Sequence, residues 1–394
     1  MSLGKKLSVL AVIVAIAAGI AYYFEVWPFA SREPRQAIEI ENGKSVMNDE
    51  PEPMKNTGPV SPITGIACEH WDRRPVAVMQ PADVSARPAA GFSSADMVFE
   101  MPVFTGANTR LMGVYLCDIP EDIGSMRSAR HDYLPLAKSL DAIFVHWGYS
   151  KFAETLLSQK VIDNINCLTT SFCPRWTQTG IMKYEDTGHI TRDAIEQAIA
   201  KYGYRTTGEF SGYPHQEEAP FENRPTGGHL RLAFPNPYDV SYDYDRSTNS
   251  YLRIWDKSPD TDKNNGERIA PKNIAVLIAE SEQIKLATDY VARGVQNPWD
   301  LVPKDEQDGL DYGGIGRYNN INMGDPWFDT KDSGDAFYYF NGKEYKGTWK
   351  KDKKSLDSKL TFLDESGKEV LFVPGQIWVD VMEPGQGIKW EPGV

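Results

Sequence analysis

The chain has 394 residues, which is more than one hydrophobic core usually organises, so two domains are expected. Hydrophobic residues make up 41% of the sequence, a share that predicts a packed globular body rather than a disordered chain. The formal net charge of −13 argues against a nucleic-acid-binding protein, because neutralising phosphates requires a basic surface.

The first residues have the pattern of a membrane anchor. Lys5 and Lys6 precede the uncharged run Leu7–Phe24, whose length is near the minimum for crossing a bilayer. The lysines favour a cytoplasmic N-terminus, which predicts a single-pass protein of the cytoplasmic membrane with its C-terminal bulk on the extracytoplasmic side. The alternative is a cleaved signal peptide, since Ala15–Ala17 offers small residues at suitable offsets. The bulky aromatic residues at the end of the run favour a retained anchor over residues 1–27.

A linker and a first domain follow the anchor. Residues 28–61 combine prolines, acids and few large apolar side chains, which predicts a flexible linker. Residues 62–213 form an α/β domain in this interpretation, because strand-like and helix-like segments are mixed along it. The expected strands lie at 76–79, 96–103, 110–116 and 141–146, and the expected helices at 132–140, 152–159 and 191–202.

The second predicted domain covers residues 225–394 and has a different sequence pattern. Short apolar or alternating runs are separated by turns rich in Asn, Gly, Asp and Ser, and Asn341-Gly342 is a strong hairpin signal. The expected strands lie at 238–245, 251–255, 274–279, 337–340, 343–349, 359–363 and 376–381. The fold class is therefore mixed α+β, with an N-terminal transmembrane helix, an α/β domain and a mainly antiparallel β domain.

Four cysteines are compatible with disulfide bonds, which persist outside the cytoplasm. They are Cys68, Cys117, Cys167 and Cys173, and they allow three pairings. Cys167 with Cys173 closes a short loop and leaves Cys68 with Cys117; free buried thiols are the alternative. No C-x-x-C pair is present, and the sequence has no nucleotide-binding or catalytic motif of the standard kinds. We therefore predict no metal site and no cofactor.

The most informative stretch is an arginine-rich segment before a predicted helix. Arg127-Ser128-Ala129-Arg130 offers two guanidinium groups, a hydroxyl and backbone N–H donors, and Arg110 begins a nearby predicted strand. Such a set at a helix start could hold an anion. The alternative is a set of internal salt bridges, since ion pairs are common in proteins. The acids that could form them are Asp122, Asp132 and Glu100.

A second polar group follows the strand at 141–146. His146 could act as a base and Ser150 as a nucleophile or ligand, because ligands of α/β folds gather beyond the carboxyl ends of strands. The alternative is that Ser150 caps the next helix and His146 is a hydrogen-bonded core residue. This structural alternative is favoured over a catalytic role for the two residues.

An ordered series of segments resembles the YerB-like family of bacterial cell-envelope proteins, whose domains have no assigned function. The segments are Arg74–Met79, Ala86–Pro88, Ala95–Glu100, Thr109-Arg110, Ile123-Gly124, Arg127–Arg130, Ile162–Asn166, Lys346–Lys351 and Pro374–Trp378. The resemblance implies a two-domain envelope protein, typically a lipoprotein, whereas this chain has a helix in place of the lipid. His189 matches a histidine of the family, but Ile190 replaces the asparagine that commonly follows it.

Two hypotheses about function follow. The first is a non-enzymatic protein that binds an anionic cell-wall component, or another envelope protein, through its first domain. Its predicted ligand-binding residues are Arg110, Arg127, Ser128, Arg130, His146, Ser150, Asp163, Asn164, Arg175 and His189. The second is a hydrolase or transferase acting on wall polymers, with His146 or His189 as general base and Asp163 or Asp96 as its helper. A spacer without a small ligand, with Trp299, Trp327 and Phe328 as a partner surface, is a third possibility.

Overall fold

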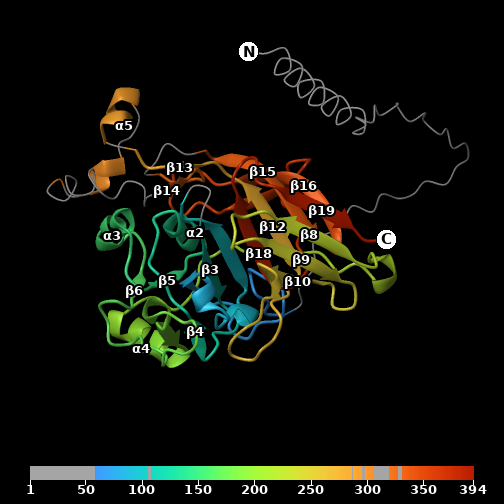
Figure 1. Cartoon of the computed structure of the whole chain (residues 1–394), viewed down its shortest axis with the longest axis horizontal. Helices are drawn as coiled ribbons and strands as arrows, with labels where there is room; N and C mark the ends of the chain where they lie inside the picture. The colour runs from blue at the N-terminus through green and yellow to red at the C-terminus, as the bar shows by residue number, and fades with distance from the viewer. Residues whose placement is uncertain are drawn as a thin grey trace, which may run out of the picture. The chain divides into compact units, whose positions relative to one another are not determined.

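A computed structural model describes residues 58–104, 108–285, 287–294, 298–302, 304, 319–326 and 331–394 (Figure 1). The predicted membrane anchor and nearly all of the predicted linker lie outside these residues. Within the described residues, no helix is both long enough and apolar enough to cross a bilayer.

The largest element is a mixed sheet of ten strands. In order across the sheet they are β17 (Thr361–Asp364), β16 (Lys343–Lys350), β15 (Ser333–Phe340), β12 (Asn273–Ile278), β18 (Ile377–Met382), β2 (Met97–Pro102), β3 (Thr109–Tyr115), β1 (Val76–Pro81), β5 (Ile143–His146) and β6 (Asn164–Asn166). Strands β12, β18 and β2 run parallel to one another, as do β1, β5 and β6, and the other neighbours are antiparallel.

Smaller sheets and a few helices complete the described fold. A five-stranded sheet has the order β11 (Ser258–Pro259), β10 (Ser250–Trp255), β9 (Val240–Asp245), β8 (Gly228–Leu232) and β19 (Ile388–Pro392). Two-stranded pairs are β13 (Ser281–Gln283) with β14 (Asn319–Ile321), and β4 (Asp122–Gly124) with β7 (His189–Thr191). The helices are α2 (Tyr133–Ser139), α3 (Lys151–Ser158), α4 (Arg192–Tyr202) and α5 (Ala287–Arg293).

The strands and helices expected from the sequence are present, and their ends agree closely except that β15 begins at Ser333. Helix α4 begins as predicted, because the hydroxyl of Thr191 accepts a hydrogen bond from the backbone N–H of Ala194 at 3.2 Å. The unexpected elements are mostly short, such as β4, β6 and β7, and three residues carry too little periodicity to predict a strand.

The ten-stranded sheet separates two hydrophobic cores. Along β1, Ala77 and Met79 face one core, and Val76 and Val78 face the other. Helices α2 and α3 contribute to the first core, while the five-stranded sheet and α4 contribute to the second. Because both faces of the sheet are covered, every residue of its central strands β1, β2, β3 and β18 is buried, including polar ones such as Glu100 and Asp380.

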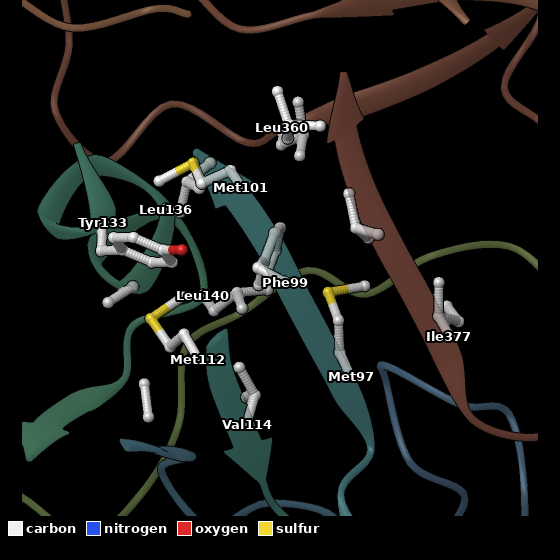
Figure 2. Packing of buried hydrophobic residues seen from close by; sticks show 14 of the residues in the cluster. Met97, Phe99, Met101, Met112, Val114, Tyr133, Leu136, Leu140, Leu360 and Ile377 are labelled. Atoms are coloured by element: carbon white, nitrogen blue, oxygen red, sulfur yellow. The ribbon is translucent and has the colours of Figure 1, made fainter. Parts of the chain in front are cut away.

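The two predicted domains share this sheet instead of forming separate ones. Strand β2 of the first region pairs with β18 of the second, so that Val98 lies opposite Trp378. Figure 2 shows Phe99 and Met101 of β2 packed between α2 and residues of the second region, among them Leu360. The fold class is mixed and mostly β, as expected, but both cores contain residues of both regions. We therefore expect the two regions to fold as one cooperative unit.

Both disulfide bonds of the favoured pairing are formed. Cys68 is bonded to Cys117 and Cys167 to Cys173, with Cα atoms 5.5 and 5.3 Å apart, and these bonds use all four cysteines of the sequence. The prediction of this pairing is confirmed, and the alternative of free thiols is wrong.

Candidate functional site

The arginine-rich segment lies at the carboxyl ends of β1 and β5. The backbone N–H of Arg127 donates to the carbonyl of Met79 at 2.8 Å, and that of Trp147 donates to the carbonyl of Arg127 at 3.0 Å. The backbone N–H of Ala129 in turn donates to the carbonyl of Gly148 at 3.0 Å. These bonds hold residues 127–130 against the loop after β5. They lie at the carboxyl ends of parallel strands, where the ligands of such sheets gather.

Arg110 on β3 lies beneath this segment with a buried guanidinium group. One of its terminal nitrogens donates to the carbonyl of Ser128 at 2.9 Å, but its Nε–H has no acceptor among the described residues. No described carboxylate forms an ion pair with it. Burial, together with the positive charges of Arg130 and Arg127, lowers the pKa of Arg110 to about 9.

Arg127 is partly exposed and only loosely paired. Its Nη2 lies 3.4 Å from Oδ2 of Asp83, and its Nε lies 3.6 Å from Oδ1 of Asp186, too far for a hydrogen bond. Asp83 is also the acceptor of a 3.5 Å contact from the hydroxyl of Tyr238, which belongs to the second region. Ser128 and Arg130 are likewise partly exposed. The three arginines, at positions 110, 127 and 130, are called the arginine cluster below.

The cluster does not depend on a helix dipole. Helix α2 begins at Tyr133 and has only 7 residues, and the side chain of Asp132 at its N-cap makes no cap hydrogen bond. A single short helix of this length has little macrodipole to offer an anion. The positive charge that these residues could offer an anion is therefore that of the guanidinium groups.

His146 is a hydrogen-bonded core residue. Its Nδ1 lies 2.7 Å from the carbonyl of Gly148 and its Nε2 lies 3.2 Å from Oδ1 of Asn164, and the residue is fully buried. Burial lowers the pKa of His146, so the ring is neutral near pH 7. Ser150 occupies the N-cap position of α3, but its hydroxyl makes no cap hydrogen bond. The backbone N–H of Ser150 donates to the carbonyl of Ala129 at 3.0 Å, which places Ser150 beside the cluster.

Arg175 and His189 belong to a neighbouring aromatic group. The guanidinium of Arg175 lies 4.3 Å from the ring centres of both Trp147 and Tyr184. His189 stacks on Trp176 with ring centres 4.5 Å apart, and its Nδ1 lies 2.5 Å from Oδ1 of Asp122. These contacts hold the loop between β6 and β7 against the sheet, and they account for both side chains without a ligand.

The structure does not bring the acidic candidates to the cluster. Asp163 forms an ion pair of 2.5 Å with Arg74, which precedes β1, so it lies near the amino ends of β1 and β5. Asp96 is buried, and its carboxylate accepts hydrogen bonds from the backbone N–H groups of Leu116 and Cys117. Neither carboxylate is hydrogen-bonded to His146 or His189. Trp299, offered as a partner surface, is fully buried against Phe152, and residues 327 and 328 lie outside the described residues.

A second group of buried charges was not foreseen from the sequence. Arg253 on β10 is fully buried, lies 2.5 Å from Oε2 of Glu100, and also forms an ion pair with Asp260. Asp380 on β18 accepts a hydrogen bond of 2.9 Å from the hydroxyl of Tyr242. These side chains come from distant positions and carry no shared motif, so only the folded sheet reveals them. We call this group the Arg253 network.

Comparison with known proteins places the chain in a family. Residues 63–205 match the N-terminal domain, and residues 230–297 and 315–379 the C-terminal domain, of a protein family of unknown function, DUF3048. The chain is 26% identical over 326 residues to "Putative lipoprotein YerB" of Bacillus subtilis, covering 82% of this chain and 86% of that protein. It also matches the crystal structure of YerB from Bacillus subtilis with a TM-score of 0.66 and 25% identity, covering 84% of this chain and 99% of the other.

The structure therefore defines a mixed, mostly β protein of two regions on one sheet, with a cluster of arginines at the carboxyl ends of parallel strands. The chain belongs to the YerB-like family with its two DUF3048 domains.

Proposed function

We propose that this chain is a cell-envelope protein of the outer face of the cytoplasmic membrane. Its relative in Bacillus subtilis is described as a lipoprotein, which is a membrane-attached class. Both disulfide bonds fit an extracytoplasmic location, since they persist in oxidising compartments and are rare in the cytoplasm. The uncharged run Leu7–Phe24 would supply attachment by a helix in place of a lipid.

We further propose that the arginine cluster binds an anionic cell-wall polymer, one that carries phosphodiester or carboxylate groups. The single observation behind this proposal is Arg110. Its guanidinium is buried, has no carboxylate partner among the described residues, and lies close enough to Arg127 and Arg130 for their charges to lower its pKa. A buried charge of this kind is costly unless an opposite charge compensates it. An anion held by the exposed edges of Arg127 and Arg130 would supply that charge.

Binding without catalysis is the function that this geometry supports best. A general base must reach a substrate proton, either directly or through one water. His146 has both ring nitrogens engaged inside the core, whereas on His189 the ring stacks on Trp176 and Asp122 engages Nδ1. A carboxylate on Nδ1, as Asp122 is on His189, is the arrangement that orients a general base, so the hydrolase or transferase alternative rests on His189 rather than on His146.

The test is co-sedimentation of the full-length chain, in detergent, with purified cell wall, followed by mass spectrometry of the soluble fraction. We expect the chain to sediment with the wall, and the double variant Arg127→Gln/Arg130→Gln to remain in solution. A matched control is Arg192→Gln/Arg231→Gln, which removes the same charge from two exposed arginines elsewhere.

Equal sedimentation of the two double variants would show that the cluster is not the binding site. New wall fragments in the soluble fraction would contradict the non-enzymatic function. Because binding of this kind is electrostatic, retention should also fall as the salt concentration rises from about 0.05 to 0.5 M.

A further inference from the structure

A buried group of metal-ligating side chains follows directly after the arginine-rich segment. His131 and Asp132 come from the start of α2, and Asp325 comes from the segment after β14. One ligand atom of each residue lies within 4.8 Å of the others, and all three residues are buried. The sequence could not indicate this group, because almost two hundred residues separate its two halves and no short motif joins them.

Two distances within the group are short enough for ligands of one ion. Nε2 of His131 lies 3.2 Å from Oδ1 of Asp132 and 3.3 Å from Oδ1 of Asn320. Bonds from Zn²⁺ to nitrogen or oxygen ligands are about 2.0–2.2 Å long, so neighbouring ligand atoms on one ion lie about 3 Å apart. The carboxylate of Asp132 is further oriented by the backbone N–H of Ile321, which donates to it at 2.8 Å. Metal ligands are commonly held in place by such outer hydrogen bonds.

The charges also suit a cation. Two carboxylates share this buried space, and buried carboxylates require a paired charge or a metal ion. The buried Lys351 nearby directs its ammonium group to the carbonyls of Leu356 and Ser358 and to the Ser358 hydroxyl, and burial lowers its pKa to about 8. Its ammonium group is therefore engaged by these three oxygens.

We propose that His131, Asp132 and Asp325, with the amide oxygen of Asn320, bind one divalent transition-metal ion such as Zn²⁺ or Mn²⁺. One imidazole nitrogen with several oxygen ligands suits these ions better than Ca²⁺, which prefers oxygen ligands alone. The ion would join residues 319–326 of the second region to the start of α2 in the first. This inference uses residues outside the arginine cluster and does not depend on wall binding.

The test measures metal binding to the full-length chain, purified without a histidine tag, stripped with a chelator and dialysed. Zn²⁺, Mn²⁺ and Ca²⁺ are titrated separately by calorimetry, and bound metal is counted by mass spectrometry. We expect one equivalent of Zn²⁺ or Mn²⁺ to bind, with an accompanying rise in the melting temperature. Asp325→Asn should weaken this binding at least tenfold, since loss of a mere outer-shell partner already costs about 10–100-fold in affinity. Asp335→Asn, an exposed carboxylate on β15, is the matched control and should bind as the parent chain does.

His131→Gln is the second variant, to be used if Asp325→Asn does not fold, as judged by circular dichroism. Absence of metal binding by the parent chain would overturn the proposal and leave the group as an internal ion-pair network. Binding that survives in both His131→Gln and Asp325→Asn would place the metal elsewhere and overturn it equally. Preference for Ca²⁺ over Zn²⁺ and Mn²⁺ would contradict the assigned ion class.

Discussion

The buried arginines Arg253 and Arg110 differ in the sign of the charges that surround them. Arg253 lies between Glu100 and Asp260, and these acids, outweighing the effect of burial, raise its pKa above the ordinary value. Arg110 is bonded to a single carbonyl and faces two further arginines, and burial lowers its pKa to about 9. Both side chains are buried, so exposure alone does not distinguish them.

We propose that this difference separates a structural charge from a ligand-binding charge. The charge of Arg253 is compensated within the fold, where it joins β10 of the small sheet to β2 of the large one. The charge of Arg110 is not compensated by any described carboxylate, and its neighbours are partly open to solvent. We infer that arginines with compensated charges, such as Arg253, stabilise the fold, and that uncompensated ones, such as Arg110, serve to bind a ligand.

Replacing Arg253 should have the largest effect on stability. Arg253→Met leaves Glu100 buried without a cationic partner and leaves Asp260 paired with Arg87 alone, and breaking a buried pair in this way costs about 3–5 kcal/mol. Urea unfolding of the full-length chain measures this loss. Arg231→Met, which breaks a solvent-exposed pair with Asp239, should cost only about 0–1 kcal/mol. Similar losses of stability in the two variants would show that the Arg253 network does not stabilise the fold.

The same network should make stability depend on pH. Burial and the nearby charge of Glu100 raise the pKa of Asp380 to about 8, so its carboxyl stays protonated in the fold well above the pH at which it ionises in the unfolded chain. The folded state therefore holds the extra proton between about pH 4 and pH 8, and stability falls as the pH rises through this window. The slope from this one group is at most about 1.4 kcal/mol per pH unit.

Asp380→Asn tests the origin of that slope. The amide cannot ionise but can still accept the hydrogen bond of Tyr242. Thermal unfolding between pH 5 and pH 8 should therefore show a flatter profile in the variant, with its largest relative gain at pH 8. A profile unchanged by the substitution would assign the pH dependence to other groups.

Replacing Arg110 should have the smallest effect on stability. Arg110→Met removes one hydrogen bond to the carbonyl of Ser128, but it also removes a buried, uncompensated charge. The net change in the free energy of unfolding should be about 1 kcal/mol or less, of either sign. A loss as large as that of Arg253→Met would mean that Arg110 is a structural residue, and the comparison would fail.

Most of the fold was accessible from the sequence, because long apolar or periodic segments predict strands and helices well. The segments at 96–103 and 191–202 are strand β2 and helix α4. The shared sheet was not predicted, since no local pattern shows that β2 pairs with β18 across more than two hundred residues. The anchor over residues 1–27 remains a prediction.

The candidate site was only partly accessible. The arginines at 127 and 130 were recognised because two such residues stand out within a short segment of an acidic chain. Sequence favoured His146 as a hydrogen-bonded core residue, which the structure confirms, but it could not show that Asp163 pairs with Arg74 at the far end of the strands. It also could not predict that Asp83 and Asp186 lie near Arg127, because these acids are far from Arg127 along the chain and meet it only in the fold.

The most direct test of the central claim is the affinity of the full-length chain for a soluble anionic polymer, with inorganic polyphosphate as the probe in calorimetry. The account predicts that Arg110→Met binds about tenfold or more weakly, because a hydrogen bond or charge contact to an ionised group is worth about 1.5–3 kcal/mol. The exposed control Arg192→Met should bind as the parent chain does. Equal affinities of the two variants, or no binding by the parent chain, would contradict the assignment of the arginine cluster as an anion site.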